Sequence, residues 1–193
     1  AARWQAAVVN TDPVGPLQAQ IQPPIRAVGE VQPVRSNRTE PKPGVHIVDL
    51  ARNLAGRIVL EVSGKAGTRV RLRQGELLYK DGTLNPMTSV MTQLKNSRVS
   101  IAMGGPPTAW QEDVYVLRGE GKETFRPRFT FHGFRYVEVT FEGEAPRSWR
   151  VFAEPMHSDV SSAGSFQCSN ELFNRIQTMV RRTQLSNMFS VQS

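Results

Sequence analysis

The sequence contains one cysteine, Cys168, among its 193 residues. A single thiol excludes a disulfide within the chain, and it excludes a zinc site built on several thiolates or on a Cys/His cluster. No histidine lies near Cys168 in the sequence that would activate its thiol. We therefore interpret Cys168 as a half-buried structural residue.

Long apolar runs are also missing. No stretch approaches the roughly 20 residues that a membrane helix needs, so no membrane partner is expected. The first residues, Ala1–Trp4, do not begin with Met and have no apolar segment of the kind found in signal peptides. We interpret the chain as processed or excised from a longer one. Periplasmic, secreted and cytoplasmic locations all stay open.

Histidines are few, and motifs for nucleotides or acyl transfer are lacking. His46, His132 and His157 have no partner at a metal-ligand spacing such as H-E-x-x-H. The chain has no G-x-S-x-G elbow, no phosphate-binding G-x-x-x-x-G-K-[ST] and no G-x-G-x-x-G. We interpret His132 as a structural histidine at a strand bend. No residue is assigned to a metal or a cofactor, and no cofactor is expected.

Acidic residues are fewer than basic ones. The chain has 24 Lys and Arg against 17 Asp and Glu, a net charge of +7. Such a balance can attract nucleic acid. However, only Arg181 and Arg182 are adjacent, and the chain has no basic run of five or more. A solvated basic surface is favoured and no nucleic-acid partner is expected. Salt-dependent DNA binding stays as a minor alternative.

Three segments differ in character. Residues 1–44 are rich in proline and are interpreted as a connector, with short strands near Ala6–Val9 and Ile25–Val34 and a polar linker over 36–44. Residues 45–157 have strand character throughout. Residues 158–193 change to a helical period.

The middle segment predicts an antiparallel β-sandwich of about seven to ten short strands. In Thr68–Gln74, Val70 and Leu72 alternate with three arginines, which indicates one buried and one wet face. Further strands are predicted at 45–50, 57–63, 113–118, 123–131, 134–141 and 148–156. In the strand 134–141, Phe134 is expected on the face opposite to Val137 and Val139.

A long excursion interrupts the strands at 85–112, with one further strand predicted at Arg98–Ala102. Among the three tryptophans, Trp110 is expected to be the exposed ring, whereas Trp149 is expected in the core. Trp4 completes the set.

The last segment predicts a helix that begins after Ser169 or Asn170, either of which can cap it. Apolar side chains then recur at helical spacing, and a stripe of this kind must be buried against something. The stripe consists of Leu172, Ile176, Met179 and Val180. A helix of this kind at the end of an all-β segment is typical of the first helix of a following domain.

Three stretches resemble one family, the bacterial α-L-rhamnosidases of glycoside hydrolase family 78. Val48–Arg57 (VDLARNLAGR) is similar to the family pattern D-[LM]-G-Q-N-x-x-G-W, with departures at Ala51, Arg52 and Arg57. Pro127–Val139 (PRFTFHGFRYVEV) is similar to P-x-F-T-Y-H-G-F-R-Y-[VI]-E-V almost residue for residue. Gly164–Ile176 (GSFQCSNELFNRI) resembles the junction into the family's (α/α)6 catalytic barrel.

The resemblance implies a concanavalin- or jelly-roll-like sandwich. It implies that residues 1–44 close a preceding jelly-roll domain, that 45–157 are an accessory β-sandwich domain, and that 158–193 begin a truncated catalytic domain. In the family the catalytic carboxylates lie on the barrel, beyond the position that matches Ser193. No position here matches them, so no catalytic residue is assigned.

The residues themselves point the same way. Glycoside hydrolysis needs two carboxylates that flank one sugar. The candidates lie in strands and turns with no pattern that pairs them: Glu76, Asp81, Glu112, Asp113, Glu138 and Glu154. Together with this observation, the resemblance implies a non-catalytic scaffold beside the barrel of an inverting α-L-rhamnosidase. The alternative is a carbohydrate-binding module for rhamnose-containing glycans that uses the 85–112 excursion or a sheet face.

Overall fold

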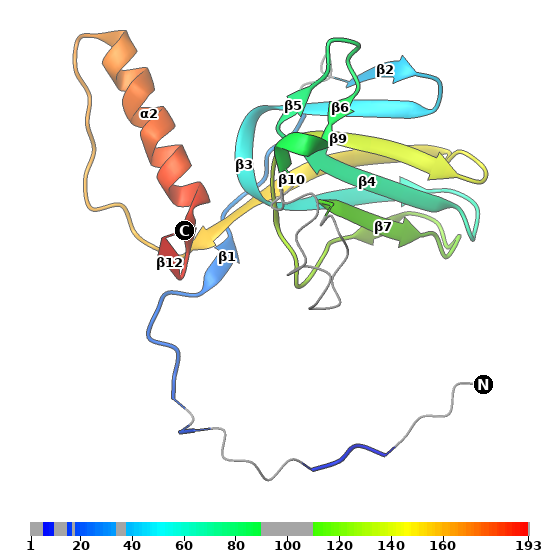
Figure 1. The fold of residues 1–193 in the computed structure, drawn as a ribbon, viewed down its shortest axis with the longest axis horizontal. Coiled ribbons are helices and arrows are strands. Elements are labelled where there is room, and N and C mark those ends of the chain that lie inside the picture. Colours follow the sequence, from blue (N-terminus) through cyan, green and yellow to red (C-terminus); the bar gives the residue numbers. More distant parts are fainter. Residues whose placement is uncertain (1–5, 10–14, 17, 34–37, 90–109, 193) are drawn as a thin grey trace, which may run out of the picture.

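A computed structural model of the chain describes residues 6–9, 15–16, 18–33, 38–89 and 110–192. Within these residues, eight strands form one strongly curled antiparallel sheet, and one long helix stands at one side of it (Figure 1). The strand order is β1-β10-β3-β9-β4-β7, and β2 and β8 also pair with β3. The fold is therefore mainly β with a C-terminal helix, as the sequence predicts.

The strands of the main sheet are β1 (Ile25–Ala27), β2 (Arg38–Lys42), β3 (Val45–Ser63), β4 (Arg69–Gly75), β7 (Glu112–Val116), β8 (Glu123–Phe125), β9 (His132–Glu142) and β10 (Ser148–Ser158). A small hairpin joins β5 (Leu77–Leu78) to β6 (Leu84–Asn85), and a 3-10 turn, η2 (Pro86–Ser89), follows it. Helix α2 (Glu171–Ser186) and a terminal hairpin of β11 (Met188–Phe189) and β12 (Val191–Gln192) end the chain.

The 19-residue strand β3 is the spine of the sheet. Its first part, Val45–Asp49, pairs with β2 and β9, and its last part pairs with β10 and β8. Between Asp49 and Leu54 the register with β9 shifts, and the strand bends there. The sequence indicated two separate strands here. The bend joins them and lets one strand serve both layers of the curled sheet.

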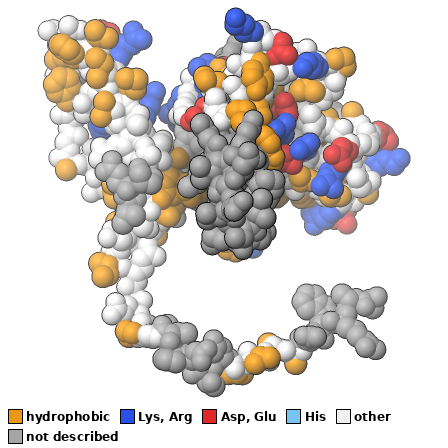
Figure 2. Space-filling view, viewed as in Figure 1, with side chains coloured by type: hydrophobic (Ala, Val, Ile, Leu, Met, Phe, Trp, Pro, Cys, Tyr) orange, Lys and Arg blue, Asp and Glu red, His pale blue; other side chains and the backbone are white. Residues whose placement is uncertain are grey.

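Strand β4 confirms the predicted alternation. Val70 and Leu72 are fully buried, whereas Arg71 and Arg73 lie on the outer face and form ion pairs with Glu112. The outer face carries cations and carboxylates interspersed, as the right-hand side of Figure 2 shows. Inside the curl, one apolar cluster contains residues from β3, β4, β9 and β10, including Ile58, Leu60, Phe134 and Val151.

The linker predicted over residues 36–44 is wrong for Arg38–Lys42, which form β2 and pair with β3. Backbone pairing with a long neighbouring strand is what orders this polar, proline-containing segment, and prolines are tolerated at a sheet edge. Ile25–Ala27 also join the sheet through β10, and Val31 forms a bridge to Ala153. Ala6–Val9, predicted as a strand, have no regular structure.

Phe134 does not lie opposite Val137 and Val139, because all three are fully buried in the same core. The reason is the bend of β3. Residues 132–134 of β9 pair with Leu54–Gly56 beyond the bend, and residues 136–140 pair with Val45–Asp49 before it. Strand β8 is also shorter than predicted and ends at Phe125. The strand predicted at Arg98–Ala102 and the residue Trp4 lie outside the described residues.

Candidate functional site

The bend of β3 exposes a short segment of chain toward helix α2. Asp49 Oδ1 accepts a hydrogen bond from the Ala51 N–H at 2.7 Å, and Ala51 has the left-handed φ of 60°. Ala51 and Asn53 are exposed and Arg52 is partly exposed, whereas Leu54 and Ala55 directly afterwards are buried. The bend therefore places one guanidinium and one amide in front of the helix.

Helix α2 begins at the predicted cap, where the Asn170 side chain accepts a hydrogen bond from the Leu172 N–H. None of its residues is buried. The predicted apolar stripe is largely exposed, with Leu172 at 58% and Met179 at 61% (Figure 2). The helix therefore leaves a hydrophobic face uncovered by the described part of the chain. It is also too short and too polar to cross a membrane.

A groove of about 730 Å³ separates α2 from the bend of β3. Its charged lining consists of Arg52, Arg175, Arg182, Glu76 and Glu171. A second hollow of about 140 Å³ adjoins it and shares Arg52 and Arg182 with it. The groove combines polar and apolar groups, as expected of a surface that another part of a protein or a ligand covers.

Of the candidate carboxylates, only Glu76 lines this groove, where its Oε1 accepts a hydrogen bond from Asn53 Nδ2 at 2.7 Å. The other candidates are engaged elsewhere. Asp81 holds a turn through Thr83 and pairs with Lys42 at 3.2 Å. Glu112 and Glu138 both pair with Arg73 on the outer face of the sheet.

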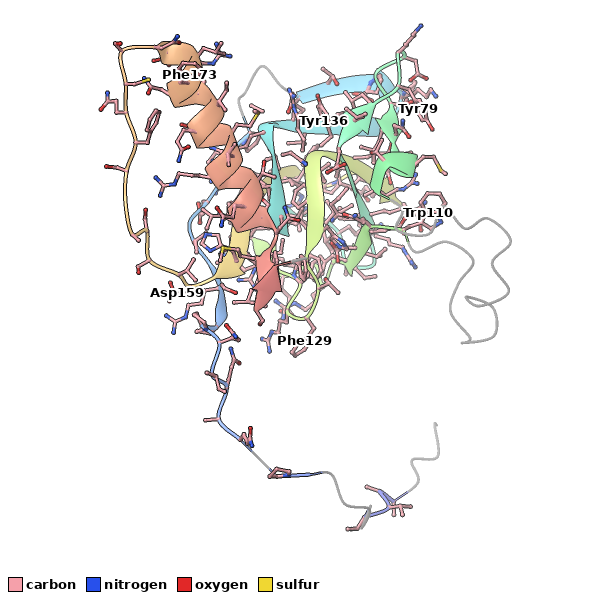
Figure 3. All side chains as sticks on the ribbon, turned by 60° about the vertical axis from the view of Figure 1, so that its left-hand side comes forward. Tyr79, Trp110, Phe129, Tyr136, Asp159 and Phe173 are labelled. Atoms are coloured by element: carbon pink, nitrogen blue, oxygen red, sulfur yellow. The ribbon has the colours of Figure 1, made fainter. Side chains whose placement is uncertain are left out.

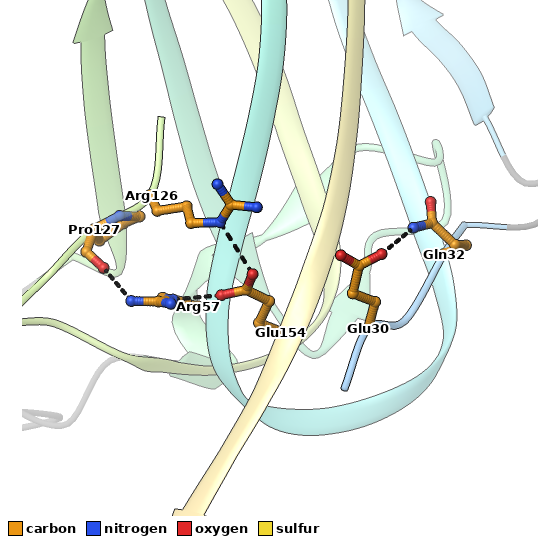
Figure 4. A network of polar contacts seen from close by, with 6 residues as sticks. All are labelled: Glu30, Gln32, Arg57, Arg126, Pro127 and Glu154. Atoms are coloured by element: carbon orange, nitrogen blue, oxygen red, sulfur yellow. Dashed lines mark hydrogen bonds and ion pairs between the residues drawn. The ribbon is translucent and has the colours of Figure 1, made fainter. Parts of the chain in front are cut away.

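Glu154 joins three segments of the chain (Figure 4). Its carboxylate accepts from Arg57 Nε at 2.7 Å and from Arg126 Nε at 3.0 Å, and Arg57 also donates to the Pro127 carbonyl at 3.3 Å. Burial alone would raise the pKa of Glu154, but the hydrogen bonds from the two arginines outweigh it and lower the pKa. A carboxylate held in this way is a structural anion and not a proton donor.

His132 lies 3.3 Å, measured from Nε2, from the Asp113 carboxylate, which also accepts from Gln74 Nε2 at 2.7 Å. His46 lies 3.7 Å from Glu40 and packs against Phe141 and Trp149. The sequence did not predict either carboxylate neighbour, because strand pairing creates both. Among the described residues no group of three or more potential ligands could hold a metal ion.

Among the residues that the structure describes, the exposed aromatic rings do not gather into one platform. Trp110 is 46% exposed, with the Arg73 guanidinium 5.4 Å from its ring centroid, and Trp149 packs on the core as predicted. Figure 3 shows Trp110, Phe129 and Phe173 projecting from separate parts of the molecule. Phe131 stacks on Phe189 with ring centroids 3.9 Å apart, and this contact, which no local pattern in the sequence indicates, fastens the terminal hairpin to the sheet.

Comparison with known proteins gives one consistent result. The model of the bacterial alpha-L-rhamnosidase concanavalin-like domain matches residues 39–157. An alpha-L-rhamnosidase of Streptomyces avermitilis is 39% identical over 175 residues, which are 91% of this chain and 15% of that protein. The crystal structure of a Streptomyces avermitilis alpha-L-rhamnosidase complexed with L-rhamnose is 39% identical and superposes with a TM-score of 0.72, covering 91% of this chain and 15% of that one.

The structure of an alpha-L-rhamnosidase from Dictyoglumus thermophilum superposes with a TM-score of 0.73 at 35% identity and covers 93% of this chain and 18% of that one. The chain thus spans less than one fifth of the length of these relatives.

Proposed function

Because this chain belongs to the bacterial α-L-rhamnosidase family and contains its concanavalin-like domain, we propose that it is a non-catalytic scaffold segment of an α-L-rhamnosidase. The parent enzyme would hydrolyse terminal α-L-rhamnosyl residues with inversion, and its catalytic carboxylates would lie outside this chain. Residues 45–157 would be the accessory domain, residues 1–44 the end of a preceding one and 158–193 the start of the catalytic one.

The observation that carries the proposal is the uncovered apolar face of α2. Leu172, Ile176 and Met179 are 40–61% exposed although their spacing is that of a buried stripe. At roughly 25 cal/mol per Å² of apolar surface, covering several such side chains stabilises a contact by several kcal/mol. A structural role is also favoured over catalysis because four of the candidate carboxylates already bind cations or hydrogen-bond donors of the sheet: Glu112, Asp113, Glu138 and Glu154.

The first test is hydrolysis of p-nitrophenyl α-L-rhamnopyranoside by this chain and by a longer polypeptide of the same protein. We expect turnover only by the longer polypeptide. Turnover by the 193-residue chain that disappears in Glu76→Gln would show that the sheet itself holds an active site, and it would overturn the proposal.

The scaffold role has its own test in the pair Leu172→Ser and Met179→Ser. Since no residue of α2 is buried in this chain, the double variant should leave its melting temperature unchanged. In the longer polypeptide the same change should cost at least about 2 kcal/mol, because the stripe would be covered there. Gln184→Ser on the same helix is the matched control. If the double variant and the wild type of the longer polypeptide had the same melting temperature, the scaffold role would be contradicted.

Sugar binding by the sheet is a second candidate, favoured by the half-exposed ring of Trp110 beside Arg73. An aromatic ring with an adjacent polar group can stack on a sugar face. Titration with L-rhamnose, followed by tryptophan fluorescence in the wild type and in Trp110→Phe, tests this candidate. The absence of any saturable change in the wild type would exclude it.

A further inference from the structure

Arg52 and Arg182 differ from most arginines of the sheet in having no counter-charge. Arg57, Arg71 and Arg135 each contact a carboxylate at 2.7–2.8 Å. Within the described residues, neither Arg52 nor Arg182 forms an ion pair with a carboxylate, and both line the same two hollows. Two cations held together without an anion are unfavourable, and the cost is larger where water is partly excluded.

The smaller hollow provides a space for such an anion. It has a volume of about 140 Å³ and is lined by Arg52, Arg182, Asn53 and His157 together with apolar residues that include Leu54 and Leu185. None of its lining residues is Asp or Glu. The volume equals that of about four or five waters, which accommodates a carboxylate with one or two methylene groups.

The electrostatics of Arg52 fit this interpretation. Partial burial lowers the pKa of Arg52, and the nearby charge of Arg182 lowers it further. An anion placed between the two guanidinium groups would counter both effects. Arginine also offers the planar pair of donors that matches a carboxylate.

The two acids of the neighbouring groove do not take this role. Glu171 and Glu76 line only the larger groove, and Glu76 accepts its hydrogen bond from Asn53. The family pattern D-[LM]-G-Q-N-x-x-G-W, which Asp49–Arg57 resembles, has glutamine at the position of Arg52. The positive charge at this position is therefore a feature of this chain. We propose that the hollow between the bend of β3 and the C-terminal half of α2 is a carboxylate-binding site held by Arg52 and Arg182.

The experiment titrates the 193-residue chain with sodium acetate at constant ionic strength, replacing sodium chloride, and follows the arginine Nε–H signals by NMR. We expect saturable shifts of the Arg52 and Arg182 signals. Arg52→Gln and, separately, Arg182→Gln should weaken binding about tenfold, because each removes one charge-assisted contact. Arg175→Gln is the matched control on the same helix, since Arg175 lines only the larger groove, and it should change the affinity less than twofold.

Shifts that grow linearly without saturation, or equal affinity in Arg52→Gln, would overturn the site. A second arm distinguishes the two sources of the carboxylate. If an acidic side chain of a longer polypeptide occupies the hollow, acetate no longer binds in that polypeptide and Arg52→Gln lowers its melting temperature. If the occupant is a free carboxylate, acetate binds there as it does in the short chain. The site does not depend on the scaffold role, so either proposal can fail alone.

Discussion

Arg135 donates to both carboxylate oxygens of Asp49, from Nε at 2.8 Å and from Nη2 at 2.9 Å. Asp49 is the last residue of β3 before the register shift, and Arg135 lies on β9 between the two paired parts. The hydrogen bonds from Arg135 lower the pKa of Asp49, and the N–H of Ala51 adds to this effect. This bidentate pair therefore fastens the start of the bend.

Asp49→Asn should destabilise the fold by about 1–2 kcal/mol, because the amide keeps one acceptor but loses the charge that Arg135 needs. The free energy of unfolding in urea measures the change. Asp159→Asn serves as the control, since its ion pair with Arg26 is exposed and should be worth at most about 0.5 kcal/mol. Equal losses in both variants would mean that the bend does not depend on Asp49.

Ala51 is strained, because its φ of 60° lies in the region that glycine occupies readily. The α-L-rhamnosidase family pattern that this stretch resembles has glycine at the position of Ala51. Ala51→Gly should therefore stabilise the chain by about 0.5–1 kcal/mol after the entropy of the unfolded glycine is subtracted. Ala55→Gly, in the same strand but without a positive φ, should destabilise. A loss of stability in Ala51→Gly would show that the bend is not under strain.

The parts of the fold that could be predicted are those with a local pattern. The alternation in β4 and the cap at Asn170 both appear in short windows of sequence, and both are confirmed. The continuity of β3 could not be predicted, since it depends on one left-handed residue, Ala51, that joins two apolar runs. Strand β2 has no apolar pattern of its own and is ordered by pairing with β3.

The candidate groove could not be predicted from the sequence either. Arg52 and Arg182 lie far apart in the chain and belong to different elements, so no spacing rule relates them. The exposed stripe of α2 was the one part of the site with a local signal, through its helical period. What the period could not predict is that the stripe would remain uncovered by the described part of the chain.

Gly56 lies where β3 is flanked closely by β10. A Cβ at this position would overlap the Glu154 carbonyl oxygen and would lie 2.9 Å from the Pro155 Cα. Because both neighbours are backbone atoms, Gly56→Ala should cost at least about 3 kcal/mol. Gly133→Ala, on the paired strand β9, would place its Cβ in open space and should cost nothing or stabilise slightly. Similar unfolding free energies for the two variants would contradict the close approach.

The stability of the chain should fall with acid in a way that depends on Glu123. Its side chain is almost completely buried and accepts hydrogen bonds from the Tyr115 hydroxyl at 2.7 Å and from the N–H groups of Arg118 and Gly119. Burial alone would raise the pKa of Glu123, but these hydrogen bonds outweigh it and hold the pKa at about 2, compared with 4.5 ordinarily.

Between these two values the unfolded chain binds a proton that the folded chain does not, so stability is fully present above pH 4.5 and is lost as the pH falls toward about 2. The contribution of this one group to the slope is about 1.4 kcal/mol per pH unit.

Urea unfolding from pH 7 to pH 2.5 measures this slope. Glu123→Gln should remove this part of the slope. Tyr115→Phe, which keeps the stack on Phe125, should raise the folded-state pKa of Glu123 because one donor is lost. The decline should then end at a higher pH, and the total acid-dependent loss of stability should be smaller. An unchanged acid limb in both variants would show that Glu123 is not the group whose protonation unfolds the sheet.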